Sequence, residues 1–204
     1  MTADQLSLDI PDPGYAWISD CGRYRYLLGW APDRQRPALG WMLLNPSTAT
    51  AETVDNTVRR VKAFTARWNY AGYEIANPFA WRATDPRELR DAQDPVGPRN
   101  DEVLSGFGRH PVTVLGWGNP GSRYPEQIAH TMGLLVSSCL NHGTKLAVLG
   151  WTKCGQPKHP LYLPAVTPLD VVDVGQAVAG AAAVDGRFRA LIELGIERAA
   201  AAAV

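Results

Sequence analysis

The chain has 204 residues and a mass of 22.2 kDa, a size that fits one domain because a single hydrophobic core serves up to about 250 residues. Hydrophobic residues make up 46% of it and charged residues 20%, which excludes intrinsic disorder as the default state. The 20 basic and 20 acidic residues cancel, which argues against a constitutive, high-affinity duplex binder but leaves room for a local basic groove.

The N-terminus and the cysteines predict a cytoplasmic protein. Residues 1–14 are acidic and lack a basic start and an apolar centre, unlike a signal peptide, and no apolar run approaches the ~18 residues that cross a bilayer. We therefore expect a flexible leader over 1–14, one domain over 15–204 and no membrane partner. Cys21, Cys139 and Cys154 form no C-x-x-C pair and fit reduced thiols. The histidines show no metal-ligand spacing, so we expect no metal and no other cofactor, and nothing indicates an obligate protein partner.

The first third of the chain predicts a hairpin and a helix. Two apolar runs, 24–30 and 38–44, flank a polar turn, and we expect a hairpin that feeds a buried strand. From Val54 to Trp68, apolar side chains recur at steps of 4, 3, 3 and 4, with Asp55 as the N-cap, which predicts one buried helix face. The opposite face carries Arg59, Arg60, Lys62 and Arg67. Such a run is typical of a solvated face, and the alternative is one wall of a phosphate groove.

The rest of the chain alternates strands and helices. Residues 72–80 form a strand broken by Pro78, and Asp85 followed by Pro86 caps and opens a short helix over 86–92. The remaining elements are expected as a helix at 102–107, a strand at 111–117, a helix at 126–140, a strand at 145–151 and a helix at 188–203. This order is typical of a three-layer α/β/α fold with a central, mainly parallel four-stranded sheet, here extended by an N-terminal antiparallel hairpin.

Polar side chains gather where the expected strands end. In open α/β sheets, ligands bind outside the carboxyl ends of the strands, and each of these strands runs into a loop of amides, hydroxyls or cations. The candidate catalytic residues are Asn45, Ser47 and His159. The candidate substrate-binding residues are Asn77, Phe79, Arg82, Thr84, Asn100, Asp101, Trp117, Gly118, Lys153 and Lys158.

Several of these candidates also have a purely structural interpretation. Asn45 and Asn77 either close Asx turns before proline or present a donor and an acceptor that position water or read a base edge. His159 is either a loop histidine or, in a site, a neutral donor to a developing oxyanion. Asp94 and Asp101, with a nearby amide, can hold a divalent cation, but their positions before turns and helices are explained equally well by capping.

The cationic and aromatic candidates leave similar alternatives. Arg82, Lys153 and Lys158 all follow strands, which favours a phosphate-binding role for at least one of them. Phe79 and Trp81 are either core residues or surfaces on which a base stacks.

Five motifs give the chain a family resemblance that spans residues 24–163. They are L-N-P-S-x-A at 44–49, D-x-T-x-R-R at 55–60, N-x-F-A-x-R-A-T-D-P at 77–86, D-P-x-G-x-x-N-D at 94–101 and G-x-P-x-H-P-L-Y at 155–162. Together they resemble a bacterial and phage family, domain-of-unknown-function family 1643. This resemblance implies no particular activity.

The order of the strand-end motifs is also similar to the uracil-DNA glycosylase superfamily. The resemblance implies that residues 45–47 orient a water, that Asn77 reads a base, and that residues 115–118 and the His159-Pro160-Leu161 run supply the third and fourth motifs. The chain departs from that pattern in three ways: the first motif has no Asp, no aromatic follows Asn45-Pro46, and the last motif is shortened. The fold implied by the resemblance tolerates these changes better than the activity does.

These observations predict a protein that recognises a nucleobase in nucleic acid or in a nucleotide, with N-glycosidic hydrolysis as its chemistry if it is an enzyme. His159 and Asn77 then stabilise the departing base, and Asn45 or Ser47 holds the water. Two alternatives stay open: a non-catalytic nucleic-acid or nucleotide-binding module, and an enzyme acting on a free nucleotide or another phosphorylated small molecule.

Overall fold

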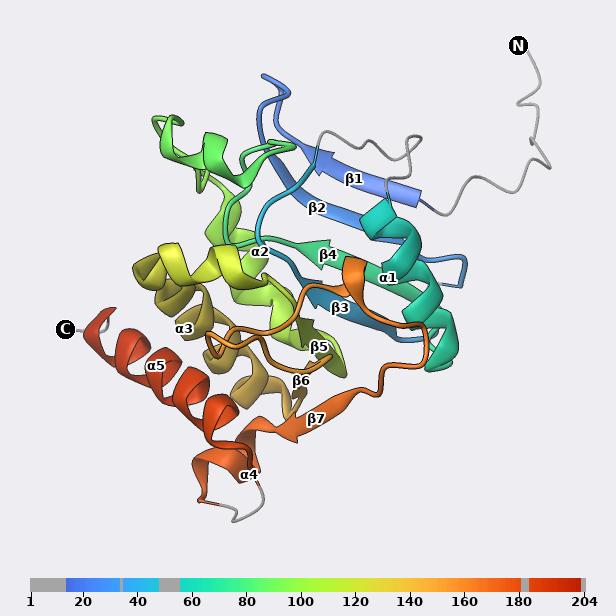
Figure 1. Cartoon of the computed structure of the whole chain (residues 1–204), viewed down its shortest axis with the longest axis vertical. Coiled ribbons are helices and arrows are strands. Elements are labelled where there is room, and N and C mark those ends of the chain that lie inside the picture. The colour runs from blue at the N-terminus through green and yellow to red at the C-terminus, as the bar shows by residue number, and fades with distance from the viewer. Residues whose placement is uncertain (1–13, 34, 48–55, 181–183, 203–204) are drawn as a thin grey trace, which may run out of the picture.

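The computed structural model describes residues 14–33, 35–47, 56–180 and 184–202. Within these ranges the chain is an α/β protein built on a mixed sheet of seven strands (Figure 1). The strands are β1 (Gly14–Ile18), β2 (Arg25–Trp30), β3 (Ala38–Met42), β4 (Gly72–Ala76), β5 (Val112–Leu115), β6 (Lys145–Val148) and β7 (Asp170–Asp173). Their order across the sheet is β1-β2-β4-β3-β5-β6-β7.

The middle of the sheet is parallel and its edges are antiparallel. Strand β3 pairs in parallel with β4 and β5, and β5 pairs in parallel with β6. Strands β1 and β2 extend the β4 side and β7 extends the β6 side, all by antiparallel pairing. The expected sheet of four strands plus a hairpin therefore omits the edge strands β1 and β7. Both are short and lack a buried apolar run, since β1 is half-buried throughout and β7 has an acid at each end.

The predicted hairpin between residues 24–30 and 38–44 is wrong. Strand β4 lies between β2 and β3, and the hairpin at this end of the chain joins β1 to β2. Strand β3 takes the central position because it is almost entirely apolar and buried, with Leu39, Trp41 and Met42 fully covered. The polar turn after β2 leads past the neighbouring position in the sheet and into β3. Strand β4, which follows helix α1 (Asn56–Arg67), occupies that position.

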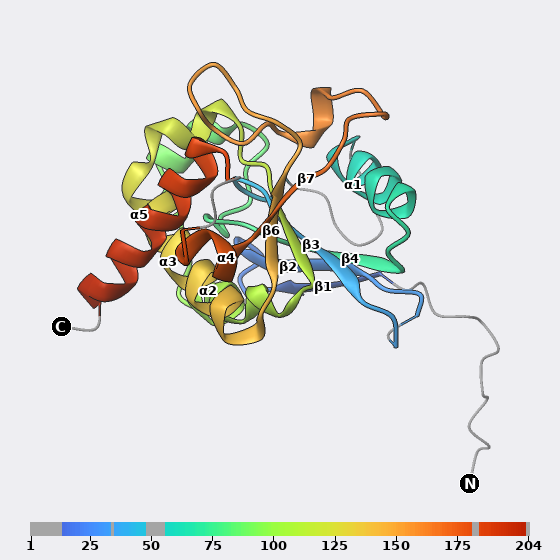
Figure 2. The same cartoon turned by 90° about the horizontal axis from the view of Figure 1, so that it is seen from below.

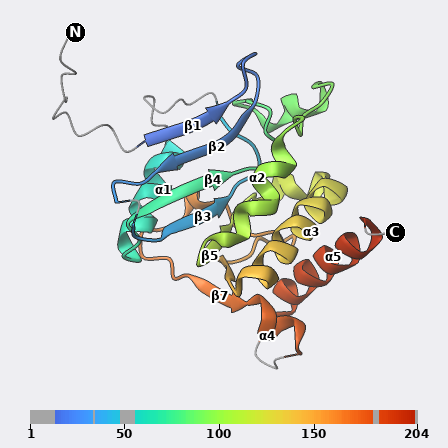
Figure 3. The ribbon, with the colours of Figure 1, turned by 180° about the vertical axis from the view of Figure 1, so that it is seen from behind.

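Helices cover both faces of the sheet. Figure 2 shows α1 on one side and α3 (Pro125–His142) and α5 (Gly186–Ala202) on the other. Figure 3 shows α2 (Asn100–Gly106) beside α3 on that second face, and the short α4 (Val174–Val178) follows β7. In the part of the chain with a described structure, no helix is both long and apolar enough to cross a membrane.

The sequence predicted N-caps for two helices, and one of these caps lies within the described residues. Asp85 caps a 3-10 turn, η1 (Pro86–Arg90). Its carboxylate accepts a hydrogen bond from the Arg87 N–H at 2.9 Å, and the Glu88 carboxylate accepts one from the Asp85 N–H at 3.2 Å. This confirms the predicted cap. The expected cap of α1, Asp55, lies outside the described residues, as do residues 1–13 of the expected leader, whereas Gly14 begins β1.

Each face of the sheet carries its own hydrophobic core. Trp41 and Phe64 lie in the core under α1, with their ring centroids 6.3 Å apart. Phe107, Trp117 and Met132 lie in the core under α2, α3 and α5. Because both faces are buried, the central strands are held rigidly, and the loops that follow β3, β4, β5 and β6 meet at one edge of the sheet.

Candidate functional site

A cleft of about 580 Å³ lies at the carboxyl edge of the parallel strands. Asn45 follows β3, Trp117 and Gly118 follow β5, and Lys158 and His159 follow β6, so three neighbouring strands supply its walls. A volume of this size is typical of a pocket for a small-molecule or nucleotide-sized ligand.

Seven of the thirteen predicted site residues line this cleft. They are Asn45, Ser47, Thr84, Trp117, Gly118, Lys158 and His159. Polar and aromatic lining residues that the sequence analysis missed are Thr57, Asn119, Thr152 and Tyr162. Tyr162 stands at the end of the turn η4 (Pro160–Tyr162) and is 85% exposed. Its place directly after the His159-Pro160-Leu161 run was the signal that could have found it.

The side chain of Asn45 is held in one orientation. Its Nδ2 donates to the Ala83 carbonyl at 2.8 Å and to the Pro46 carbonyl at 3.2 Å. Both partners are acceptors only, so the amide nitrogen must be the atom that faces them. The Asn45 Oδ1 is therefore the end of the amide that can accept a hydrogen bond from a ligand or a water.

The imidazole of His159 is also fixed by the backbone. Its Nδ1 accepts the Leu161 N–H at 3.3 Å, which caps η4. A nitrogen that accepts a hydrogen bond carries no proton, so the neutral ring holds its proton on Nε2. His159 lines the cleft, and in this tautomer its only N–H is at Nε2.

Trp117 forms the third wall of the cleft, and its ring is held in place by the contacts around it. Its Nε1 donates to Gln156 Oε1 at 2.7 Å. A Cβ at Gly121 would lie 2.2 Å from Trp117 Cδ1, so the backbone packs directly against the ring. Gly118 has a φ of +70°, and its N–H donates to the Pro157 carbonyl at 2.9 Å, which ties this wall to the loop after β6.

A small pocket of about 50 Å³ adjoins the cleft and shares Asn45, Ser47, Thr57 and His159 with it. Its other polar residues are Asn77, 2% exposed, and Arg25, 4% exposed. Asn77 Nδ2 donates to the Leu43 carbonyl at 2.8 Å and so joins the ends of β4 and β3.

Arg25 is a site residue that the sequence analysis missed. The available signal was a charged residue inside the apolar run 24–30.

The charges that line the two cavities are positive. Lys158 lines the cleft and Arg25 lines the small pocket, whereas no described Asp or Glu lines either one. The acidic residues Glu52 and Asp55 fall in the range 48–55, outside the described residues.

Three predicted candidates lie away from the cleft on exposed or core positions. Phe79 is buried and packs edge-on against Tyr124, with 4.8 Å between ring centroids. Arg82 Nη1 donates to the Gly22 carbonyl at 3.0 Å, on the side of the β1–β2 turn. Lys153 is exposed at the tip of the loop after β6, because the pairing of Trp151 with Pro157 folds that loop back on itself.

Two further candidates act within the scaffold. Asn100 is fully buried, and its Nδ2 donates to the Asn77 carbonyl at 2.9 Å and the Pro78 carbonyl at 3.2 Å. It supports the loop after β4 from beneath. Asp101 forms an exposed ion pair with His130 at 2.9 Å, and among the described residues no cluster of three or more His, Cys, Asp or Glu is placed to hold a metal.

A known protein family matches most of the chain, including most of the cleft. Residues 25–161 match the family described as "Protein of unknown function (DUF1643)". The chain belongs to this family. No curated protein and no solved structure matches the chain. The DUF1643 region contains every lining residue of the cleft except Tyr162 and Leu163.

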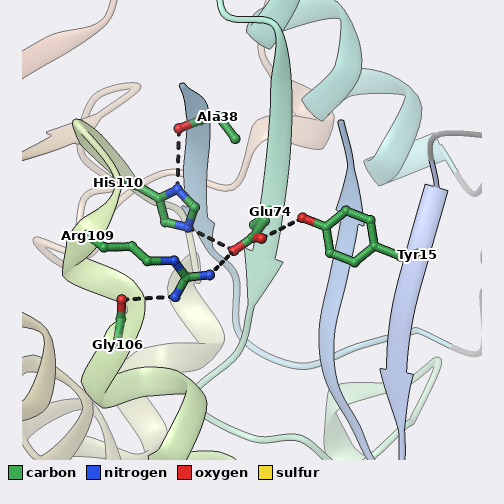
Figure 4. Close-up of polar contacts among 6 residues, drawn as sticks. All are labelled: Tyr15, Ala38, Glu74, Gly106, Arg109 and His110. Atoms are coloured by element: carbon green, nitrogen blue, oxygen red, sulfur yellow. Dashed lines mark hydrogen bonds and ion pairs between the residues drawn. The ribbon is translucent and has the colours of Figure 1, made fainter. Parts of the chain in front are cut away.

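The DUF1643 region also holds most of a second polar cluster, which the sequence analysis did not find (Figure 4). Glu74, 9% exposed, accepts three hydrogen bonds: from Tyr15 Oη at 2.5 Å, from Arg109 Nη2 at 2.6 Å and from His110 Nε2 at 3.0 Å. The register places Glu74 between Gly29 of β2 and Gly40 of β3.

The two glycines make this cluster possible. A Cβ at Gly29 would lie 2.2 Å from Tyr15 Cζ, and one at Gly40 would lie 3.0 Å from His110 Cδ2. Tyr15 therefore reaches Glu74 by crossing β2 at Gly29, and His110 reaches it by crossing β3 at Gly40, because neither glycine has a side chain in the way. The cluster thereby joins β1, β4 and the residues that precede β5.

Proposed function

We propose that the cleft binds a nucleotide unit, with its phosphate near Lys158 and its base between the aromatic and amide side chains. The observation that carries this proposal is that Lys158, His159 and Asn45 line one cleft that also includes Trp117 and Tyr162. The order of strand-end motifs, which is similar to that of the uracil-DNA glycosylase superfamily, supports the same ligand class.

The chemistry of a nucleotide matches the two kinds of lining group. A phosphate oxygen forms a charge-assisted hydrogen bond with an ammonium group, worth about 1.5–3 kcal/mol. A base offers donors and acceptors along its edge and a flat face that stacks on an aromatic ring for about 1–3 kcal/mol. Asn45 and His159 present one acceptor and one donor, and Tyr162 is an accessible ring.

Calorimetric titration with 2′-deoxynucleoside 5′-monophosphates tests this proposal. Lys158→Gln should weaken binding by roughly tenfold or more, because it removes the charge-assisted bond. The matched control is Lys153→Gln, which removes the same charge from the same loop but outside the cleft. Equal effects of the two variants, or no binding of any monophosphate by the wild-type protein, would overturn the proposal.

We further propose that the ligand's N-glycosidic bond is hydrolysed in this cleft. The favouring observation is that Asn45 and His159 are each held by the backbone in one orientation, one as an acceptor and one as a donor. Asn45 Oδ1 or Ser47 holds a water beneath C1′, and His159 Nε2–H stabilises the base as it leaves as an anion. The bond from C1′ to the base nitrogen breaks, a bond from C1′ to the water oxygen forms, and the water's proton is released to the base or to solvent.

Catalysis is tested with oligonucleotides that contain uracil and other deaminated or alkylated bases, single- and double-stranded. Hot alkali converts each abasic site to a strand break, which gives the rate. His159→Ala should lower that rate by about 10²–10³, and Asn45→Asp should lower it as well, because a carboxylate oxygen would face the Ala83 and Pro46 carbonyls where the amide N–H groups now donate. If no substrate is cleaved while His159→Ala still weakens nucleotide binding, the protein is a binding module.

A further inference from the structure

Apart from its first residue, Asn56, the exposed face of helix α1 consists of basic residues and alanines. At 3.6 residues per turn, Arg59, Arg60, Lys62 and Arg67 share one side with Ala63 and Ala66. The opposite side, formed by Val58, Val61, Phe64 and Thr65, is buried in the core. No acidic residue occurs anywhere in α1, although the chain as a whole has no net charge.

Four arginines elsewhere in the described chain are neutralised by a nearby acid. Arg87, Arg99, Arg109 and Arg187 each pair with a carboxylate within 3 Å. Within residues 14–33, 35–47, 56–180 and 184–202, none of the four basic residues of α1 forms an ion pair. The positive charge of α1 is thus concentrated on one face and is not compensated by any described acid.

The basic face of α1 lies directly beside the cleft. Arg60 Nη2 donates to the Leu163 carbonyl, and Leu163 also lines the cleft. The segment around Leu163 forms a ridge at this edge of the cleft. Beyond the ridge lies a second hollow of about 210 Å³, which we call the α1 hollow; it is lined by Arg60, Ala63, Phe64, Arg67 and Ala165. The chain from η4 to residue 165 therefore separates the cleft from the hollow, and η4 packs against α1 (Figures 1 and 2).

Two arginines of the hollow are positioned differently. The guanidinium of Arg60 is anchored by the Leu163 carbonyl and lies over the Phe64 ring, with 5.0 Å from Cζ to the centroid. Arg67 is exposed and lies two turns further along the same side of α1. A planar guanidinium is suited to phosphate oxygens because its donors match them two at a time.

We infer that the cleft and the α1 hollow together bind one unpaired strand of nucleic acid. The base of one nucleotide enters the cleft, and the sugar-phosphate backbone crosses the ridge at Leu163 to reach Arg60 and Arg67, with Arg59 beside them. This inference rests on the proposed function, and it identifies the ligand as a polymer rather than a free nucleotide. An unpaired strand fits because a base within a duplex is stacked and cannot enter a cleft without being extruded.

The test measures binding of a fluorescein-labelled single-stranded oligodeoxynucleotide of about 12 residues at several salt concentrations. The double variant Arg59→Gln/Arg67→Gln removes two exposed charges from α1. Its control, Lys145→Gln/Arg198→Gln, removes two exposed charges from the amino end of β6 and from α5. Each lost phosphate contact should lower the slope of log affinity against log salt by about 0.7, so the α1 variant should lose about 1.4 and bind roughly tenfold more weakly at low salt.

The two variants and two ligands separate the possible results. Loss of affinity and slope in the α1 variant but not in the control supports the inference, and a duplex of the same sequence should bind more weakly. Equal behaviour of the two variants overturns it. If deoxynucleotide monophosphates bind in a Lys158-dependent manner while the oligonucleotide binds no better, the proposed function stands and the polymer inference fails. If neither ligand binds, both fail.

Discussion

The Glu74 cluster offers a prediction of stability that is independent of function. Tyr15→Phe removes one of the three hydrogen bonds that the buried carboxylate accepts but keeps the ring over Gly29. A hydrogen bond to a charged group contributes about 1.5–3 kcal/mol, so we expect the free energy of unfolding to fall by about 2 kcal/mol at pH 7. Tyr70→Phe is the control, because the Tyr70 hydroxyl bonds to no described residue.

The pH dependence of this effect has a defined sign. Burial alone raises the pKa of Glu74, but hydrogen bonds from His110 and Tyr15 and the charges of His110 and Arg109 outweigh it, so the pKa in the folded protein is below its usual 4.5. A carboxylate with a depressed folded pKa stabilises the protein above its unfolded pKa, and this contribution is lost as the pH falls through the folded value. The penalty of Tyr15→Phe should therefore shrink as the pH falls below 4.5.

Urea unfolding followed by tryptophan fluorescence at pH 7 and at acidic pH measures both effects. Glu74→Gln should cost more than Tyr15→Phe at pH 7, because it leaves His110 and Arg109 without their carboxylate. In the double variant, the further loss from Tyr15→Phe should be much smaller than in the wild type. A Tyr15→Phe variant as stable as Tyr70→Phe would refute the view that this hydrogen bond stabilises the sheet.

Two further predictions concern the exposed thiol and the cleft wall. A hydrogen bond from the Ser19 hydroxyl, together with Arg23, lowers the pKa of Cys21 to about 7, so Ellman's reagent should react with it at a rate that rises to half its maximum near pH 7. Cys21→Ser should abolish this fast phase, whereas an unchanged fast phase would show that another thiol is responsible. Gly121→Ala should displace the Trp117 ring, shift the fluorescence emission and weaken nucleotide binding, and wild-type emission and affinity in that variant would show that the ring is not held as described.

The sequence predicted the parallel centre of the fold better than its edges. Continuous apolar runs such as 111–117 and 145–151 mark strands buried on both faces, and those strands occur as β5 and β6. Strands β1 and β7 take their structure from pairing with β2 and β6, which no local pattern reports. The hairpin error has the same cause, because the insertion of β4 between β2 and β3 depends on a crossover through α1.

The site was predictable to the extent that position in the chain determines position at the sheet edge. Asn45, Trp117 and His159 directly follow strands and line the cleft. Lys153 also follows a strand, but its loop folds back and carries it away, which depends on hydrogen bonds between residues 152 and 156. Arg25 was missed because a charge near the start of an apolar run gives no sign of which way its side chain is buried.

The most direct test of the proposal that the cleft binds a nucleotide is a ¹⁵N NMR titration with 2′-deoxyuridine 5′-monophosphate. The Trp117 indole N–H donates to Gln156 and lies at the cleft wall, so its signal, assigned with Trp117→Phe, reports on this site alone. We expect the Trp117 indole and the Gly118 and Tyr162 amide signals to shift together and to saturate, and Lys158→Gln to weaken that response. Shifts confined to residues remote from the cleft, such as Arg23 and Trp81 in a separate pocket, would contradict the proposed site.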